Sequence, residues 1–301
     1  MKKYVKLFVL FLFFGICQKS KAQETSAATY IDGEKPSLVA KKFAPGFISK
    51  SNEYEFGSIF SKDATEFYFA VSVKGKGEIR YTYLNKGKWT TPKTIISHAK
   101  YGYNDPFLSP DEQRLYYISN MPRDANDTIN DIDIWYSIKK GNSWSEPINA
   151  GMNINSDKNE YYISFTTSGT MYFASNKNAP MNGNNDFDIY AASTAKGIFD
   201  IPKKLSSAIN TKDYEADVFV APDESYIIFA ANRKEGFGRG DLYISFKSLN
   251  NEWLPAKNMG TSINTTGHEL CPFVTYDGKY FFYTSKQDIY WVSTELFEQY
   301  R

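Results

Sequence analysis

Short runs of aromatic and β-branched residues alternate along the chain with clusters of Pro, Asp, Asn and Gly. One stretch shows the pattern: the run Pro106–Leu108, the turn Ser109–Glu112, and the runs Leu115–Ser119 and Ile134–Ser137, before another begins at Trp144. Runs of this length and composition predict β-strands joined by tight turns. No stretch after residue 22 has a convincing helical period. The pattern therefore predicts an all-β protein built from short antiparallel strands.

The predicted strands recur with a period near 50 residues. An acidic residue followed by Ile or Leu, and in four of five copies by Tyr or Trp, recurs at spacings of 55, 55, 53 and 47 residues. A large aromatic follows 11 or 12 residues later in the first four copies, and a proline comes soon after it. The acidic positions are Glu78, Asp133, Asp188, Asp241 and Asp288, and the aromatics are Trp89, Trp144, Phe199 and Trp253. The fifth copy ends too early to contain the aromatic and the proline.

A second set of positions recurs at constant offsets from the first. Glutamates lie 16 residues after three of the aromatics, and an asparagine precedes each of them by five residues. The glutamates are Glu160, Glu215 and Glu269, and the asparagines are Asn155, Asn210 and Asn264. Four antiparallel strands repeated every ~50 residues are typical of propeller blades. Five copies therefore predict a five-bladed β-propeller of four-stranded antiparallel blades.

The repeat resembles the WD-like β-propeller repeats of the Pro-Asp variety found in TolB-like periplasmic proteins. Pro110-Asp111 and Pro222-Asp223 carry the dipeptide that gives the variety its name, and the resemblance covers about residues 36–296. The first blade departs from it, with Lys62-Asp63 and no asparagine before Tyr103. The resemblance implies the fold and an envelope protein, but it says little about activity because propellers serve many functions.

The incomplete fifth copy predicts how the ring closes. An open propeller would leave an unpaired strand edge, which promotes aggregation. The segment before Glu55 can supply the missing outer strand, because Val39 lies 16 residues before Glu55, where other copies have their aromatic. We therefore expect one propeller domain over residues 36–301, closed by an N-terminal strand, with residues 23–35 as a flexible lead.

The first 22 residues have the layout of a secretory signal peptide. A lysine-rich start is followed by the apolar run Leu7–Cys17 and by the small residues of Ser20–Ala22, which predicts cleavage after Ala22. The run is shorter than the ~20 residues that span a bilayer, so no transmembrane segment is expected. Lipidation of Cys17 is the alternative, but Ile16 stands where a small residue is expected. The sequence favours an exported protein, periplasmic or secreted, without a lipid anchor.

Charge and sulfur content narrow the function classes. The full chain has 35 basic and 34 acidic residues, and removal of the first 22 leaves 30 and 34, a net charge of −4. This charge balance does not indicate nucleic-acid binding, which needs clustered basic charge. Cys271 is then the one remaining cysteine, so we expect no internal disulfide and a thiol buried as a small hydrophobe. His98 and His268 are the only histidines, too few for a histidine-rich zinc site.

The glutamate positions admit two interpretations. Blade topology places the start of each innermost strand on the same face as the loops between second and third strands. The predicted channel-mouth ring is Glu55, Tyr103, Glu160, Glu215 and Glu269. It could accept structural hydrogen bonds, or it could bind a cation or a sugar. Glycosidases need carboxylates in different roles, whereas these recur at one equivalent position. The structural interpretation is favoured, and a glycoside hydrolase-like enzyme with no assigned catalytic residue is the alternative.

Loops of unequal length on a rigid scaffold are the usual place for binding. The predicted loop face consists of Asp124, Asn126, Asp127, Asn182, Asn184 and Asp186. Their oxygens suit calcium, but Asp124–Asp133 lacks the glycine and the final glutamate of an EF-hand loop, which favours solvated turns and no cofactor. The sequence as a whole predicts an exported, non-catalytic scaffold whose partner is an envelope protein or a surface polymer.

Overall fold

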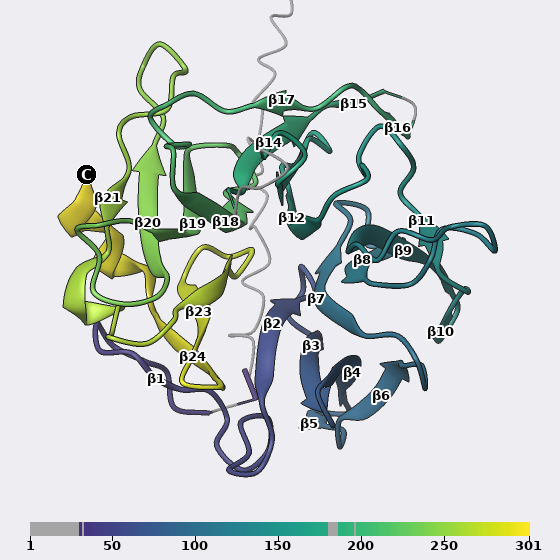
Figure 1. The fold of residues 1–301 in the computed structure, drawn as a ribbon. Coiled ribbons are helices and arrows are strands. Elements are labelled where there is room, and N and C mark those ends of the chain that lie inside the picture. Colours follow the sequence, from purple (N-terminus) through teal and green to yellow (C-terminus); the bar gives the residue numbers. More distant parts are fainter. Residues whose placement is uncertain (1–29, 32, 180–185, 196) are drawn as a thin grey trace, which may run out of the picture.

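The computed structural model describes residues 30–31, 33–179, 186–195 and 197–301. Five small antiparallel sheets are arranged around a common axis, as Figure 1 shows, so the protein is a five-bladed β-propeller as predicted. Within the described ranges, no helix is long and apolar enough to cross a membrane. The predicted signal peptide and Cys17 lie outside the described residues.

Each blade starts with its innermost strand and proceeds outwards. Blade one contains β2 (Glu55–Phe60), β3 (Glu66–Val73), β4 (Lys76–Asn85), β5 (Lys88–Trp89) and β6 (Lys93–Ile96). Blade two contains β7 (Tyr103–Leu108), β8 (Arg114–Ser119), β9 (Asp133–Lys140), β10 (Ser143–Trp144) and β11 (Ile148–Asn149). Blade three contains β12 (Glu160–Phe165), β13 (Met171–Ser175), β14 (Asp188–Ala192), β15 (Thr194–Ala195), β16 (Ile198–Phe199) and β17 (Lys203–Lys204).

The last two blades follow the same order. Blade four contains β18 (Tyr214–Val220), β19 (Tyr226–Asn232), β20 (Asp241–Phe246) and β21 (Lys257–Asn258). Blade five contains β22 (Leu270–Val274), β23 (Tyr280–Ser285), β24 (Asp288–Ser293) and, as its outer strand, β1 (Lys41–Lys42). Two 3-10 helices complete the described chain, η1 (Gly260–Ser262) and η2 (Thr294–Tyr300).

The N-terminal segment closes the ring, as predicted. Strand β1 pairs antiparallel with β24, and Lys41 lies opposite Trp291. The residue that anchors this closure is not Val39, which is 75% exposed, but Phe43, which is fully buried and contacts the ring of Trp291 at 5.2 Å between centroids. In Figure 1 the strands β1 and β24 run side by side.

Both ends of the described chain fill gaps between blades. Tyr30 is buried between Phe60 of blade one and Tyr280 of blade five, at 5.3 and 5.0 Å between ring centroids. This end of the predicted flexible lead is therefore part of the folded core. At the other end, helix η2 takes the place of the missing aromatic strand, and its Phe297 contacts Tyr226 of blade four at 5.5 Å. Terminal aromatics thus replace the repeated Trp where the repeat is incomplete.

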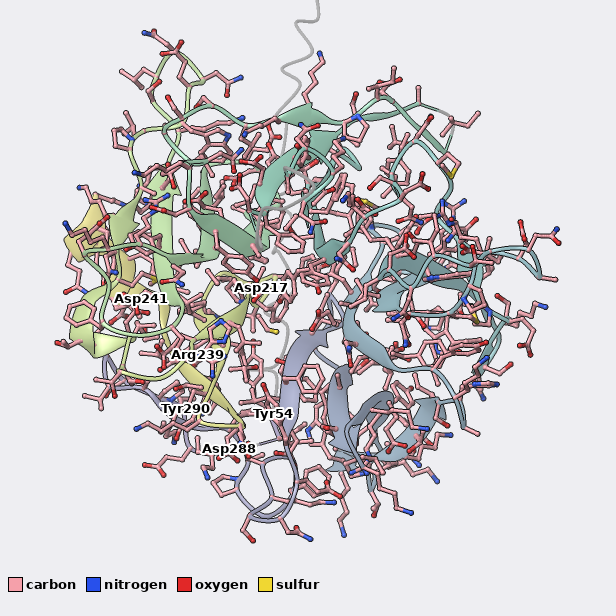
Figure 2. All side chains as sticks on the ribbon, in the orientation of Figure 1. Tyr54, Asp217, Arg239, Asp241, Asp288 and Tyr290 are labelled. Carbon is pink, nitrogen blue, oxygen red and sulfur yellow. The ribbon has the colours of Figure 1, made fainter. Side chains whose placement is uncertain are left out.

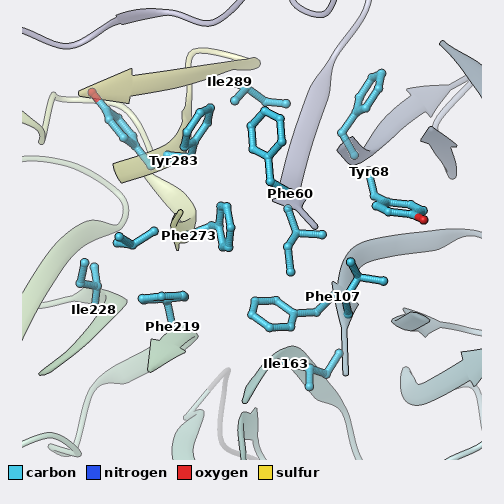
Figure 3. Packing of buried hydrophobic residues seen from close by; sticks show 14 of the residues in the cluster. Phe60, Tyr68, Phe107, Ile163, Phe219, Ile228, Phe273, Tyr283 and Ile289 are labelled. Carbon is cyan, nitrogen blue, oxygen red and sulfur yellow. The ribbon is translucent and has the colours of Figure 1, made fainter. Parts of the chain in front are cut away.

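Aromatic side chains also fill the middle of the ring. Phe107, Phe219 and Phe273 come from the innermost strands of three blades and are at most 3% exposed. Figure 3 shows them converging with Phe60 on one region, and Phe273 contacts Phe219 and Phe107 at 5.9 and 6.3 Å between centroids. Each buried ring removes ~150–250 Å² from water, so the central space is packed rather than open at this level.

Candidate functional site

The channel-mouth ring predicted from the sequence is buried. Its four glutamates are each 0% exposed and stand at or next to the start of an innermost strand. Glu160 accepts hydrogen bonds from the backbone N–H and the hydroxyl of Ser156, at 3.0 and 2.7 Å, and from the hydroxyl of Ser175 at 2.6 Å. Ser156 lies in the connection from the preceding blade, and Ser175 ends the second strand. The carboxylate therefore fastens the incoming connection to its blade.

Two other glutamates repeat this arrangement. Glu215 accepts from the N–H and hydroxyl of Thr211 at 2.9 and 2.7 Å, and Glu269 does the same with Thr265 at 2.9 and 2.8 Å. The third partner differs between them. It is the Arg233 guanidinium for Glu215, at 3.1 Å, and the Ser285 hydroxyl for Glu269, at 2.7 Å.

The first two members of the ring are more weakly bonded. Glu55 accepts from the Lys50 N–H at 3.2 Å, while its other oxygen has no hydrogen-bond partner. Tyr103 is 3% exposed. Burial raises the pKa of both Glu55 and Glu160 to about 7, since an ionised carboxylate is costly away from water. The ring therefore presents no exposed carboxylate.

The repeated asparagines bind one backbone site in the preceding blade. Asn155 accepts from the Ile134 N–H at 2.8 Å and donates to the Ile134 carbonyl at 2.9 Å. The same pair of bonds joins Asn210 to Ile189 and Asn264 to Leu242. Because the asparagines lie in the connections between blades, each one ties a connection back to the third strand of the blade it leaves.

The repeated aspartates join third and fourth strands. Asp133 accepts from the Asn149 amide at 2.9 Å, and Asp241 accepts from the Asn258 amide at 2.8 Å. Lysines take the place of the asparagine in blades three and five, where Lys204 pairs with Asp188 at 2.6 Å and Lys42 with Asp288 at 2.7 Å. Figure 2 shows Asp241 and Asp288 away from the centre of the ring, and their described contacts are structural.

A second layer, which sequence reasoning missed, lies two residues further along each innermost strand. We call it the axis layer, and it consists of Gly57, Asp105, Tyr162, Asp217 and Cys271. All five residues have positive φ, between 44° and 54°. Each also lies where its strand shifts register against the next strand, as in a β-bulge. A bulge redirects a side chain and disrupts local pairing, and Asp217 accordingly lies near the ring centre in Figure 2.

The axis layer is linked across blades. The Cys271 sulfur lies 3.5 Å from Asp105 Oδ1. The Tyr162 hydroxyl donates to the Pro272 carbonyl at 2.9 Å. At Gly57, a Cβ would lie 2.8 Å from Asp105 Oδ1, so the missing side chain makes room for that carboxyl. Five strands of different blades thus meet at one level of the axis.

Burial controls the charge of this layer. It raises the pKa of Asp105 to about 7 and that of Asp217 to about 8, and the charge of Asp105 adds to the effect on Asp217. Burial also holds the pKa of the Cys271 thiol well above its usual value, which makes it a poor nucleophile. Cys271 is buried as predicted, although its sulfur contacts the polar side chain of Asp105. Both aspartates are less than 9% exposed, so the layer has two enclosed carboxyls whose protonated form is favoured by burial.

The predicted loop face is shaped by one arginine. Arg123, between β8 and β9, lies 3.4 Å from carboxylate oxygens of Asp127, Asp131 and Asp133, and 3.2 Å from Asp157. Its guanidinium thus organises the acidic loop that had suggested calcium. In the described part of the chain, no three His, Cys, Asp or Glu side chains are placed to hold a metal ion.

The predicted loop residues consequently differ in availability. Asp127 forms an ion pair with Arg123. Asp124 and Asn126 are exposed, and the Asn126 N–H donates to the Asp124 carboxylate at 2.7 Å within the turn. Asp186 is partly buried, with one carboxylate oxygen unpartnered. Asn182 and Asn184 lie outside the described residues.

Comparison with known proteins supports the fold. No family model and no curated protein matches the chain. TolB from Acinetobacter baumannii is similar in structure, with a TM-score of 0.52, 15% identity, and coverage of 82% of this chain and 56% of that chain. A protein of unknown function from Dyadobacter fermentans has a TM-score of 0.50 and 13% identity, with 86% and 83% covered. A putative TolB from Agrobacterium tumefaciens has a TM-score of 0.48 and 12% identity, with 77% and 70% covered.

These similarities concern the fold. The chain spans about half the length of the Acinetobacter TolB, and the identities are low. The assignment to the Pro-Asp variety of repeat stays a prediction. In its architecture, the chain is a five-bladed propeller similar to the β-propeller of TolB-like proteins.

Proposed function

We propose that this chain is an exported, non-catalytic binding scaffold of the cell envelope, whose partner is a protein or a surface polymer. The proposal rests on the burial and the hydrogen bonds of the recurring glutamates. The four ring glutamates are 0% exposed, and Glu160, Glu215 and Glu269 each accept at least three hydrogen bonds from side-chain and backbone donors of their own blade or its connection. A glycoside hydrolase needs two accessible carboxylates in different roles, so this arrangement favours binding.

The proposed contact face is the end of the propeller that carries the loops between second and third strands. Variable loops on a rigid ring are well suited to recognition. Arg123 holds the longest described loop through four carboxylates before any partner arrives. A loop that is already ordered loses less conformational entropy on binding. Exposed Asp124 and Arg239 give this face both signs of charge, and exposed Asn126 adds a neutral amide.

Site-specific photo-cross-linking in the producing cells tests this proposal. A photoreactive residue is placed at Asn126 or Glu235, both exposed in loops between second and third strands. The matched control position is Asn250, exposed in a turn at the opposite end of blade four. We expect a discrete adduct from the two loop positions and none from Asn250. Adducts from Asn250 alone, or no adduct from any position, would contradict the proposed face.

A further inference from the structure

A polar aromatic groove lies between blades one and two, near the end of the ring opposite the loop face. It has a volume of about 560 Å³, within the ~300–1,000 Å³ typical of ligand sites. We call it the seam groove. The residues that carry the argument are Glu66, Tyr68, Tyr81, Tyr83, Lys93 and Lys139, with Trp144 at its side.

The corresponding spaces at three other seams are smaller or plugged. Between blades two and three the groove measures about 320 Å³ and is bordered by exposed Met152 and Ile198. Between blades four and five it measures about 200 Å³, and η2 lies there with Phe297 and Tyr300 buried. Tyr30 fills the seam between blades five and one. The first seam thus combines a larger space with more polar walls.

Aromatic rings form one wall of the seam groove. Tyr81 and Tyr83 project from the same side of β4, with centroids 5.5 Å apart and planes inclined by 20°. Tyr68 lies against Tyr81 at 4.8 Å, and Trp144 meets Tyr68 edge-on at 6.1 Å. The Tyr83 ring is partly exposed, and its hydroxyl makes no hydrogen bond to the described residues. The two rings are stacked on each other, and the partly exposed Tyr83 presents an electron-rich ring face to the groove.

Polar groups lie beside these rings in a fixed arrangement, and Glu66 is the cross-strand neighbour of Tyr83. Glu66 accepts hydrogen bonds from the hydroxyls of Tyr68 and Tyr81 at 2.9 and 3.0 Å, and Lys139 Nζ lies 3.4 and 3.2 Å from its two oxygens. These four contacts match the about four acceptor positions of an ionised carboxylate, so Glu66 holds the tyrosines and Lys139 in place. Lys139 neutralises Glu66, and exposed Lys93 forms no ion pair with any carboxylate in the described ranges. The groove therefore has one uncompensated positive charge.

We propose that the seam groove binds an acidic saccharide unit, a hexuronate within a surface polysaccharide. The polarised C–H bonds on the flat face of a sugar ring match the negative face of the partly exposed Tyr83 ring. The Tyr83 hydroxyl bonds a ring hydroxyl, and Lys93 pairs with the carboxylate of the sugar. This site lies away from the loop face and does not rest on the function proposed for that face.

Calorimetric titration of the full exported chain tests the site. The probes are trisaccharides of galacturonate and of mannuronate, with a neutral galactose trisaccharide as the comparison. We expect binding of at least one acidic probe, a loss of about tenfold or more for Tyr83→Ala, and a loss restricted to acidic probes for Lys93→Ala. Both side chains are partly or fully exposed, so these variants should keep the melting temperature. Ile138→Ala, at the equivalent position of blade two and 39% exposed, should leave affinity unchanged.

Several outcomes would overturn the proposal. Failure of both acidic trisaccharides to bind at millimolar concentration would remove the site. Binding that survives Tyr83→Ala would place the sugar elsewhere, and equal affinity for the neutral trisaccharide would remove the assigned role of Lys93. None of these results affects cross-linking from Asn126, so the two proposals fail independently.

Discussion

The channel-mouth ring and the axis layer lie two residues apart on the same five strands, yet they differ in what is repeated. Four members of the ring are glutamate, and three of those share hydroxyl and N–H partners at equivalent positions. The axis layer repeats its backbone conformation, with positive φ in all five blades, while its five side chains include four different types. Repeated side chains thus hold each blade together, whereas a repeated backbone bulge shapes the axis and leaves its side chains free to differ.

The largest expected effect comes from adding one methyl group to the axis layer. In Gly57→Ala the new Cβ would lie 2.8 Å from Asp105 Oδ1 and 3.0 Å from Asp105 Cα, at a φ of +48°. Overpacking and left-handed strain together should lower the free energy of unfolding by about 4 kcal/mol. Gly75→Ala is the control, because its φ is +78° but nothing lies within 4 Å of the new Cβ. Urea denaturation should show a loss of about 1 kcal/mol there, and equal losses would refute the crowding argument.

Loss of a repeated asparagine should come next. Asn264→Ala leaves the buried N–H of Leu242 without its partner, while the Leu242 carbonyl still accepts from the Met259 N–H. An unsatisfied buried group costs ~1–3 kcal/mol, so we expect a loss of about 2 kcal/mol. Asn250→Ala, at an exposed turn, should change stability by less than ~0.5 kcal/mol. Similar melting temperatures for the two variants would show that the repeated asparagines are not structural fasteners.

The axis layer should also set a pH dependence. The folded-state pKa values of Asp105 and Asp217, about 7 and about 8, lie above the ordinary value, so the folded protein holds more protons than the unfolded chain. This stabilisation is complete below the unfolded pKa near 4 and is lost as pH rises through 7 and 8. Between pH 6 and pH 9 the free energy of unfolding should fall by on the order of 2 kcal/mol or more.

Glu55 and Glu160 contribute to the pH dependence in the same direction, because burial raises their pKa values too. The variant Asp217→Asn separates the contribution of Asp217 from theirs. Asp217→Asn keeps the shape of the protonated carboxyl and cannot ionise. The decrease in stability between pH 6 and pH 9 should therefore be smaller in Asp217→Asn than in the wild type. Identical pH profiles would show that Asp217 does not hold its proton in the folded state.

The smallest effect is expected on the loop face, where two aspartates three residues apart differ in their contacts. Asp127 accepts from the backbone N–H groups of Arg123 and Ile129 at 2.8 and 3.0 Å, whereas exposed Asp124 makes only a local turn bond. Asp127→Ala should lower the melting temperature more than Asp124→Ala, because only Asp127 accepts from two backbone N–H groups. Amide hydrogen exchange should speed up in the loop around Ile129 for the first variant only. The reverse order would show that Arg123 does not organise the loop.

The fold could be predicted because its repeated bonds require particular side chains at fixed offsets. Asn155 and Glu160 recur since each blade reuses the same backbone partners. Closure by the segment before Glu55 was correct, but the offset pointed to Val39 rather than to Phe43. The terminal segments replace the repeat without copying it, so Tyr30 and Phe297 gave no periodic signal.

The axis layer could not be recognised in the same way. Gly57, Tyr162 and Cys271 share no chemistry, and their common feature is a backbone angle. The partner of Cys271 is Asp105, 166 residues away, and sequence spacing does not reveal such a contact. The one available signal was the constant offset of two residues from the ring. For the seam groove, Tyr81 and Tyr83 looked like ordinary strand residues because partial exposure of a ring is a property of the folded surface.

The central claim is that the recurring glutamates support the ring and perform no chemistry. Glu160→Gln tests it most directly, because it removes the charge at nearly constant size and leaves a single oxygen to accept from the Ser156 N–H and from the hydroxyls of Ser156 and Ser175. Thermal melting and release of reducing ends from glycans should be measured together for the wild type and this variant. We expect a loss of stability of about 1–3 kcal/mol and no hydrolysis by either protein. Turnover by the wild type that disappears in Glu160→Gln, with the melting temperature unchanged, would contradict the account.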